Sequence, residues 1–479
     1  DSNLPVYEYM VSHIEKSHAI PLSIPQINNN MSVLGDPLNS FFNPLFGLSI
    51  LAFGINIGLR VTILLCCFVS GITMYFLLKK FSKEKIIWLF GSFLYMSGGA
   101  FFASVASGHI EKFLVYPIIP LLLFWGINKK LLVRQMLGLG FVVIWTIYSG
   151  DLYATWFCIL MYTVIRGYFF FTQKQKKQQL IFFILPLCIA IVLALPKIVP
   201  FVQQVLPFME KSGEVNAFKG SLPWYYFPVP FIEPFGVWFW DRPFFQRHLG
   251  FYYNWYEYFA FITPIPFIFL IKVKKIFSKE IFKAIMLLLT LGTLYFSLSF
   301  WYSPFFWVFH FSVLQDFFRV PQRIVMPMTT VVVLLLSLCT EEWLRMGKRR
   351  LVILVFVVSL FWTLAVDWQI LSTTFPKNDS LRRNMIAQFA QKYKKVTVVN
   401  FATQVQYFLI QKNMRVDNYY YGWYAKNSIL YTKNGKINLS ALVAKKPEFI
   451  VTNTYKKMPI PIGYTKLMGN TEIVIWRRI

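Results

Sequence analysis

The sequence predicts a polytopic α-helical membrane protein with about ten membrane helices and a small C-terminal α/β domain. Hydrophobic residues make up 56% of the 479 residues and charged residues only 14%, whereas soluble domains contain about 25% charged residues. Long apolar runs alternate with short turns that are rich in lysine and arginine. Both features are typical of a chain that crosses a bilayer many times.

The order of the apolar runs predicts three regions. We interpret 1–56 as an extracytoplasmic loop with short helices, 57–370 as the transmembrane domain and 371–479 as an extracytoplasmic α/β domain. The transmembrane domain includes a large outer loop, 207–256. The apolar piece 45–55 is too short to span a bilayer, so we expect it to be re-entrant or interfacial.

Ten apolar runs are the predicted spans. Three of them have at most about 15 residues, fewer than the roughly 20 that a spanning helix needs. These short runs are 113–127, 135–148 and 258–272. The longer runs are 57–79, 86–106, 152–171, 179–206, 281–300, 324–340 and 351–370. Pro196 and Pro200 predict a break in the span that contains them, because proline removes a helical hydrogen bond.

The distribution of charge predicts the orientation of these spans. Alternate turns carry clusters of lysine and arginine, which the positive-inside rule places in the cytoplasm. The other turns are longer and carry most of the acids and histidines, so we expect them outside. The chain begins at Asp1 on that outer side, and we expect a membrane helix to precede it. The net charge of +27 suits membrane lipids and phosphate-bearing lipid carriers, whereas no nucleic-acid-binding module accompanies it.

The C-terminal region has a different pattern. Helical periodicity at 380–393 and 403–412 alternates with β-rich pieces at 396–400, 448–452 and 472–476. About 100 residues suffice for a modest core, so a small α/β domain is predicted. The five cysteines of the chain lie inside apolar runs, which favours buried thiols over disulfides or a metal site.

The stretch Ser107-Gly-His-Ile-Glu-Lys112 lies between two predicted spans. Ionisable groups at membrane depth are costly and usually mark a pathway or a site. His109 and Glu111 are a base and a carboxylate that can act on an acceptor hydroxyl, and Lys112 can bind phosphate. The alternative is that all three are polar residues of a short loop, with Lys112 extending its amine to the interface.

Basic residues near other outer ends extend this set. Arg319 and Arg323 flank Pro321 at the mouth of a span, and two guanidinium groups can clamp a phosphate or pyrophosphate. Arg60 and Lys197 are weaker candidates of the same kind. Interfacial anchoring is the alternative role for each of these side chains.

Asp1 and Asp36 are the candidate carboxylates of the N-terminal region. Asp1 would lie just outside a membrane helix if one precedes it, and the alternative is an ordinary solvated residue. Asp36 in Gly-Asp-Pro equally suits a turn. The aromatic loop 223–256 suits either the headgroup belt of a membrane or stacking on sugar rings. Three further polar candidates lie in or beside this loop: Asp241, His248 and Glu257.

Several familiar motifs are absent from the sequence. It contains no P-loop, dinucleotide fingerprint, His-Glu-x-x-His or Gly-x-Ser-x-Gly. The sequence therefore shows no motif for chemistry on cytosolic nucleotides. No predicted span carries a chain of midplane acids, which argues against an ion-coupled transporter.

Short motifs spread over essentially the whole chain form a recognisable pattern. They are Asp1, Gly35-Asp36-Pro37-Leu38, Asn43-Pro44-Leu45, Ser107-Gly-His-Ile-Glu-Lys112 with Pro117 and Pro120, Phe318-Arg-Val-Pro-Gln-Arg323 and the basic α/β tail. This pattern resembles the membrane glycosyltransferases of the GT-C class. Within that class it looks most similar to the bacterial YfhO-like and family 39-like proteins.

The resemblance implies a lipid-linked sugar donor, usually a polyprenyl-phosphate sugar. The active site would face away from the cytoplasm of a bacterial-type cytoplasmic membrane, and the acceptor would be an envelope polymer, lipid or protein. Asp1 would be the catalytic carboxylate. The residues that assist it or hold the acceptor would be Asp36, His109 and Glu111. The residues that hold the phosphate and stabilise the leaving group would be Lys112, Arg319 and Arg323. No cofactor is implied except a divalent cation, which only some members of the class use.

Two other functions stay open at this point. A transporter or flippase of lipid-linked saccharides would share the basic and aromatic outer surface, but it needs a continuous polar path through the membrane. A non-catalytic envelope-assembly protein would bind a partner through its tail. Such a protein would have no pocket that joins Asp1, Asp36, His109 and Arg319. Whether these four residues converge at the outer face of the membrane therefore helps to separate the three functions.

Overall fold

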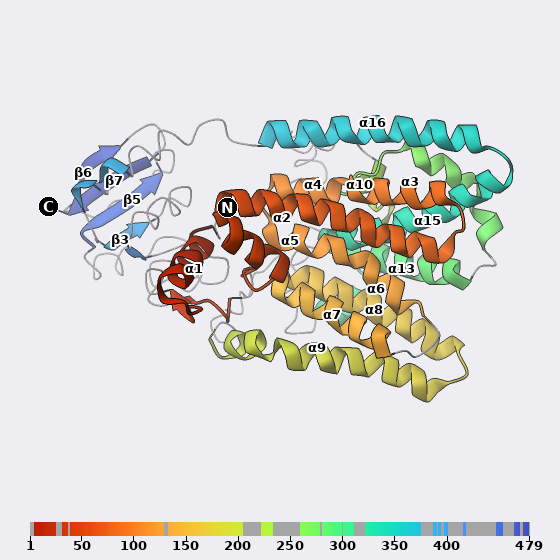
Figure 1. The fold of residues 1–479 in the computed structure, drawn as a ribbon, viewed down its shortest axis with the longest axis horizontal. Coiled ribbons are helices and arrows are strands. Elements are labelled where there is room, and N and C mark those ends of the chain that lie inside the picture. The colour runs from red at the N-terminus through yellow and green to blue at the C-terminus, as the bar shows by residue number, and fades with distance from the viewer. Residues whose placement is uncertain are drawn as a thin grey trace. The chain divides into compact units, whose positions relative to one another are not determined.

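The computed structural model describes residues 4–24, 31–36, 39–128, 133–204, 222–232, 259–277, 280–298, 300–310, 321–374, 387–389, 391–393, 397–400, 415–417, 447–453, 464–469 and 473–478. The chain forms two compact units. Unit 1 consists of Asp1–Leu59, Leu195–Lys211 and Pro376–Ile479, and unit 2 consists of Arg60–Ala194 and Ser212–Phe375. Most of the helices belong to unit 2, and the five-stranded sheet belongs to unit 1 (Figure 1).

Unit 2 is a bundle of apolar helices that lie roughly alongside one another (Figure 1). Two of its helices, α2 and α9, continue into unit 1. The elements of the bundle are α2 (Pro44–Phe81), α3 (Lys85–Met96), α4 (Gly99–Ala106), α5 (Ile110–Val115), η1 (Tyr116–Ile118), α6 (Ile119–Gly126), α7 (Val133–Ser149), α8 (Leu152–Thr172), α9 (Lys176–Gln204), η3 (Trp224–Tyr226), α10 (Val229–Ile232), η5 (Ile265–Ile276), α13 (Glu280–Phe296), α14 (Pro304–His310), η7 (Pro321–Ile324), α15 (Val325–Arg345) and α16 (Arg349–Thr374).

Six helical segments of the described chain are long and apolar enough to cross a membrane. They are α2, α3 with α4, α8, α9, α15 and α16. Two further apolar helices, α7 and α13, are shorter. The prediction of a membrane-embedded polytopic helical protein is confirmed to this extent, and the count of about ten spans stays a prediction.

Helix α15 forms the centre of unit 2. Its residues Val325–Glu342 are all buried, and it packs against α3, α13, α16 and η5. Apolar residues occupy most of its positions, and a helix that is apolar all round belongs in the interior of a bundle. The predicted span 324–340 corresponds to this helix.

The predicted span 86–106 consists of two helices, α3 and α4. The chain bends between them at Gly98, where an added Cβ would lie 2.6 Å from the Tyr116 hydroxyl. Tyr95 and Tyr116 stack with 4.3 Å between their ring centroids. Each hydroxyl donates a hydrogen bond to the backbone carbonyl of the other residue, at 2.7 and 2.8 Å. The absence of a side chain at Gly98 therefore leaves room for this buried pair.

Two predictions about proline-containing runs are wrong, whereas the one about the piece 45–55 stays a prediction. The backbone at Gly54 is not helical (φ 70°, ψ 169°) and divides the start of α2 from the rest of that helix, so this short piece is distinct from the span that follows it. Helix α9 continues through Pro196 and Pro200, since a membrane bundle tolerates proline where neighbouring groups satisfy the backbone. The run 113–127 is not one helix: it divides into α5, η1 and α6, with a proline at the start of each of the last two.

The predicted span 258–272 also differs from the structure. Residues 259–263 are not helical, and η5 is a 3-10 helix that begins at Ile265, directly after Pro264. Gly99 donates a hydrogen bond from its backbone N–H to the Phe261 carbonyl at 2.8 Å. The irregular segment thus uses a backbone carbonyl to join the start of α4, a contact that a regular helix could not make.

The lysine-rich turns meet at one end of unit 2. Lys80 donates hydrogen bonds to the Phe124 carbonyl at 2.7 Å and to the Asn128 side chain at 2.6 Å. Arg166 of α8 donates to the Asn128 carbonyl at 2.9 Å and to the side chain of Gln179 on α9. The lysine-bearing ends of α2, α8 and α9 therefore lie together, as the alternating charge pattern predicts.

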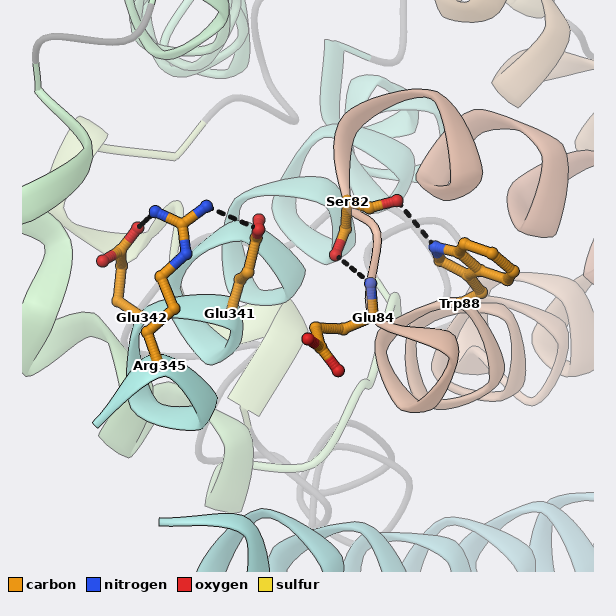
Figure 2. A network of polar contacts seen from close by, with 6 residues as sticks. All are labelled: Ser82, Glu84, Trp88, Glu341, Glu342 and Arg345. Atoms are coloured by element: carbon orange, nitrogen blue, oxygen red, sulfur yellow. Dashed lines mark hydrogen bonds and ion pairs between the residues drawn. The ribbon is translucent and has the colours of Figure 1, made fainter. Parts of the chain in front are cut away.

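Helix α15 also ends at this lysine-rich end (Figure 2). Arg345 in its last turn pairs with Glu341 at 2.8 Å and with Glu342 at 3.1 Å. In the turn between α2 and α3, the Trp88 indole donates to the Ser82 carbonyl at 2.9 Å. These polar contacts are local, and each one fixes the end of a helix.

Unit 1 contains α1 (Leu4–Ser17), a short antiparallel pair of β1 (Ser23–Ile24) with β2 (Met31–Ser32), and the five-stranded sheet. The strands of the sheet are β3 (Thr397–Asn400), β4 (Arg415–Asp417), β5 (Phe449–Asn453), β6 (Tyr464–Gly469) and β7 (Ile473–Arg478). Their order is β4-β3-β5-β7-β6. β3 is parallel to both β4 and β5, whereas β7 is antiparallel to β5 and β6.

The predicted α/β pattern of the C-terminal region is confirmed in part. The β-rich pieces 396–400, 448–452 and 472–476 correspond to β3, β5 and β7, whereas β4 and β6 were not predicted. Of the helical pattern 380–393, residues 387–389 and 391–392 are helical. The ring of Phe389 packs edge-on against that of Phe449, with 5.1 Å between centroids. The second helical pattern, 403–412, lies outside the described residues.

Candidate functional site

Two turns with the same sequence pattern lie at the end of unit 2 opposite the lysine-rich turns. They are Ser107-Gly108-His109 between α4 and α5 and Ser149-Gly150-Asp151 between α7 and α8. In both turns the glycine has a left-handed backbone, with φ of 73° at Gly108 and 85° at Gly150. Glycine enters this region at little cost. Each turn thereby places a polar residue directly before the next helix.

The first turn closes α4 with a Schellman motif. The backbone N–H of His109 donates to the Ser104 carbonyl at 2.9 Å, and that of Gly108 donates to the Val105 carbonyl at 3.1 Å. These two bonds satisfy carbonyls that a helix end leaves without a partner. They also fix the position of His109 at the start of α5.

His109 and Glu111 form a close polar pair in this turn. His109 Nδ1 lies 2.6 Å from Glu111 Oε1. The imidazole is 25% exposed, so solvent or a ligand can reach it, whereas the carboxyl side chain is 10% exposed. When a carboxylate accepts the Nδ1 proton, Nε2 becomes the basic nitrogen of the ring.

The Glu111 carboxyl is held in its ionised form. Burial acts to raise its pKa, but His109, the backbone and Lys112 outweigh that effect, and the pKa is lowered overall. Glu111 is therefore a carboxylate at neutral pH. Its charge can orient the imidazole of His109 and stabilise it when the ring is protonated.

A small cavity lies among these elements. Its charged lining consists of Lys112 from α5, Asp151 from the second turn and Arg323 from η7, and its apolar lining includes Phe157 and Phe259. Its volume of ≈ 20 Å³ is enough to hold about one water molecule. Two cations and a carboxylate from three separate parts of the chain thus meet around one cavity.

The three charged residues of the cavity are held in different ways. Lys112 is 4% exposed and Asp151 is 3% exposed. Asp151 accepts a hydrogen bond from the Ala154 backbone N–H at 3.0 Å, so it also caps α8. The guanidinium of Arg323 lies over the ring of Tyr153, 4.5 Å from its centroid, a distance typical of a cation–π contact.

Asp151 is electrostatically linked to the other charged residues. Burial raises the pKa of its carboxyl, and the negative charge of Glu111 adds to this shift. Arg323, the Ala154 amide and Lys112 oppose the shift without cancelling it. His109, Glu111, Lys112 and Arg323, four of the predicted site residues, therefore belong to one electrostatic group with Asp151.

Asp151 is the residue of this group that sequence reasoning missed. A usable signal was present, because Ser149-Gly150-Asp151 repeats the pattern of Ser107-Gly108-His109 at the same end of the predicted spans. A repeated glycine turn followed by an ionisable residue is a reason to group the two turns.

Asp36 and Lys197 form a second polar group, which belongs to unit 1. Both side chains are buried, and they lie within electrostatic range of each other. Lys197 donates to the Asn39 carbonyl at 2.8 Å. The Asn39 side chain in turn donates to the Val33 carbonyl and accepts from the Phe41 N–H, both at 2.9 Å. The segment around Asp36 is therefore a folded, buried turn that Lys197 reaches from α9.

The remaining predicted residues are not part of the cavity or lie outside the described chain. Arg60 on α2 is exposed and does not line the cavity. The candidates outside the described residues are Asp1, Asp241, His248, Glu257 and Arg319, with most of the aromatic loop 223–256. Trp224 and Tyr225 of that loop are described, and they are exposed. The predicted convergence of Asp1, Asp36, His109 and Arg319 stays a prediction.

Metal-binding side chains are scattered in the part of the chain that the structure describes. No three histidine, cysteine, aspartate or glutamate side chains gather there in a group that could hold a metal ion. Cys66, Cys158 and Cys339 are buried, and thiols buried in apolar surroundings are usually inert packing residues. A role for a divalent cation stays a prediction.

Comparison with known proteins places the chain in no family. No protein-family model matches the sequence, and no curated protein matches it. The resemblance to GT-C enzymes is therefore a hypothesis about function, and the residues around the cavity have to support it.

Proposed function

We propose that this chain is a membrane glycosyltransferase of the GT-C type. It would move a sugar from a polyprenyl-phosphate donor to an acceptor hydroxyl of the cell envelope. The observation that supports this function best is the cavity lined by Lys112, Asp151 and Arg323, beside the pair of His109 and Glu111. Transfer from a sugar phosphate needs cations for the phosphate and a base for the acceptor, and both kinds of group are present.

Lys112 and Arg323 would bind the phosphate of the donor. The ammonium of Lys112 is largely removed from water, and a charge in such surroundings attracts an anion more strongly than it does in water. The guanidinium of Arg323 offers paired donors that match two phosphate oxygens. Both cations would stabilise the negative charge that grows on the phosphate as it leaves the sugar.

His109 would act as the general base. Its Nε2 would take the proton of the acceptor hydroxyl while the acceptor oxygen bonds to C1 of the sugar. The bond between C1 and the phosphate oxygen breaks, and the electron pair leaves with the phosphate toward Lys112 and Arg323. The carboxylate of Glu111 would stabilise the imidazolium that forms. Asp1 and Arg319, assigned by resemblance to the base and the phosphate clamp, would add to these groups if they join the site.

Asp151 would act on Arg323 rather than on the substrate. It lines the same cavity, and its charge interacts with that of the guanidinium. Tyr153, two residues further along α8, contacts the guanidinium from its ring face. The start of α8 would thus set the direction of Arg323, which makes Asp151 a positioning residue.

The surroundings of the cavity suit a lipid-linked donor. Apolar helices long enough to cross a membrane form unit 2, so the polyprenyl chain would stay in the bilayer while its phosphate reaches the polar end. The lysine-rich end suits the cytoplasmic face, which would put the cavity on the extracytoplasmic face. Because the cavity holds about one water molecule, binding of a sugar phosphate has to widen it.

Transfer can be tested with the full chain in proteoliposomes that contain a labelled polyprenyl-phosphate sugar and an envelope-derived acceptor. We expect labelled acceptor from the wild type and a loss of at least about tenfold with Lys112→Met, since one charged hydrogen bond to a leaving group is worth about 1.5–3 kcal/mol. Lys348→Met is the matched control, because Lys348 is exposed at the other end of unit 2. It should keep full activity.

The same assay separates the proposal from its rivals. Movement of the labelled donor across the bilayer with no labelled acceptor would indicate a transporter or flippase. Neither transfer nor movement, with several lipid-linked sugars and acceptors, would favour an assembly protein. Equal activity of Lys112→Met and Lys348→Met would contradict the proposed phosphate site even if transfer occurs.

A further inference from the structure

A buried carboxyl group in α16 belongs to none of the groups described above. Asp367 is 3% exposed, and neither of its side-chain oxygens has a hydrogen-bond partner within the described part of the chain. It lies about 27 Å along the helix from Arg349, inside the segment Arg349–Gln369 that is apolar enough to span a membrane. An ionisable residue in such a segment is costly and usually has a function.

The described neighbours of Asp367 bring no positive charge to it. Two ionisable groups within its electrostatic range are Cys67 of α2 and Tyr116 of η1, and neither of them is a cation. Helix α4 packs against α16 and contains no ionisable residue. The charged residues of α3, η5 and α15, which also contact α16, lie in the half of each element that is nearer the lysine-rich end. The described part of the chain therefore offers an ionised Asp367 neither a donor nor a cation to replace the lost water.

We propose that Asp367 is an intramembrane proton-binding site, which carries a proton while α16 is packed in unit 2. A buried polar group that lacks a partner is least costly in its neutral form. A metal ion would need further ligands, and the described residues contain no suitable group of three. The proton is the one cation that needs neither additional ligands nor additional space.

Proton release at Asp367 would act on the wall of the candidate site. Its neighbour Val366 packs in one cluster with Ala103 and Phe259, and Phe259 also lines the cavity. An ionised Asp367 would favour an arrangement in which α16 moves away from α4 and the carboxylate meets water. Protonation would thus couple the packing of α16 to the shape of the cavity, whatever ligand the cavity binds.

Infrared spectroscopy of the full chain in lipid bilayers tests the protonation directly. At neutral pH we expect an absorption band of a protonated carboxyl that is lost in Asp367→Asn and kept in Asp367→Glu. Glu341→Gln is the matched control: Glu341 is equally buried but pairs with Arg345, so its removal should take away a carboxylate band instead. Loss of a carboxylate band in Asp367→Asn would overturn the proposal.

A second measurement needs no variant and so does not depend on the folding of Asp367→Asn. Lipid-soluble dicyclohexylcarbodiimide adds to a protonated carboxyl: a carboxyl oxygen bonds to the central carbon, and the proton moves to nitrogen. Nothing leaves, so the peptide gains the mass of the whole reagent. We expect mass spectrometry to find this adduct on Asp367 at neutral pH and to find less of it as the pH rises. No adduct at any pH, or an amount that does not change with pH, would contradict the proposal.

Discussion

Arg166 and Arg323 lie at opposite ends of unit 2 and are used in different ways. Arg166 is fully buried, and it donates to two backbone carbonyls at the end of α6 and to Gln179 of α9. Arg323 lies over the ring of Tyr153 and lines a cavity. One guanidinium joins three helix ends, whereas the other is placed where a ligand can approach.

The difference shows that a buried cation does not by itself mark a site. At the lysine-rich end, Lys80 binds a carbonyl of a neighbouring helix and Arg345 binds acids of its own helix. At the other end, Lys112 and Arg323 share a cavity with a carboxylate. Substitutions at the first end should therefore affect folding, and substitutions at the second should affect activity.

The largest expected effect is on activity at the cavity end. We expect His109→Gln to lower the rate of sugar transfer by about 10²–10⁴, because a positioned base contributes that much. Thermal unfolding should change little, since the imidazole is partly exposed. Steady-state transfer rates at saturating donor measure the effect. A rate within about threefold of the wild type would remove His109 from the proposed chemistry.

The next effect is on stability at the lysine-rich end. We expect Arg166→Met to lower the free energy of unfolding by about 3 kcal/mol or more, because it leaves buried carbonyls without their donor. Arg323→Met is the matched change at the other end and should cost less than about 1 kcal/mol while it abolishes transfer. Denaturant unfolding in detergent micelles measures both. Equal losses of stability in Arg166→Met and Arg323→Met would contradict the view that one arginine has a structural role and the other a functional role.

A smaller loss of stability is expected at the first glycine turn. Gly108→Ala should cost about 1–2 kcal/mol, because a side chain in the left-handed region is strained. Gly167 provides the control: it lies within helix α8 with open space where a Cβ would be, so Gly167→Ala should be neutral or stabilising by up to about 1 kcal/mol. The midpoints of thermal unfolding compare the two. A Gly108→Ala midpoint equal to that of the wild type would mean that the turn is not what positions His109.

The smallest expected effect is a change in pH dependence at the second glycine turn. The pKa of Asp151 is raised in the folded protein, so the folded state binds more protons than the unfolded state between the ordinary and the raised pKa. Its contribution to stability is therefore lost as the pH rises through that window. Asp151→Asn keeps a good helix cap and removes this dependence.

The difference in unfolding midpoint between the wild type and Asp151→Asn measures that effect. The wild type should lose stability relative to the variant as the pH rises above the usual range of an aspartate. The pKa of Glu111 is lowered in the folded protein, so the effect of pH on stability has the opposite sign. The stability that the wild type has in excess of Glu111→Gln should therefore disappear as the pH falls. If the unfolding midpoint of the wild type rises relative to that of Asp151→Asn with increasing pH, folding does not raise the pKa of the Asp151 carboxyl.

The long apolar segments could be predicted from the sequence because length and composition alone decide them. Helices α8, α15 and α16 correspond closely to the predicted runs 152–171, 324–340 and 351–370. Local rules failed where the bundle overrides them. Pro196 did not break α9, because a proline ends a helix only if nothing else satisfies the freed carbonyl.

The candidate site could be predicted only in part. The ionisable residues of the turn at Ser107–Lys112 were visible because they interrupt an apolar sequence. The cavity could not be predicted, because it depends on which helix ends pack together. Asp151 and Arg323 meet there from distant parts of the chain. Asp367 was overlooked because a single acid near the end of an apolar run resembles an ordinary interfacial residue.

Side-specific labelling tests the opposition of the two ends most directly. A membrane-impermeant maleimide would be applied to each face of sealed vesicles that contain His109→Cys or Lys348→Cys, with the native cysteines replaced. Both positions expose side-chain surface. We predict that the cysteine at 109 reacts only from the extracytoplasmic face and the cysteine at 348 only from the cytoplasmic face. Reaction of both from the same face would contradict the proposed placement of the candidate site.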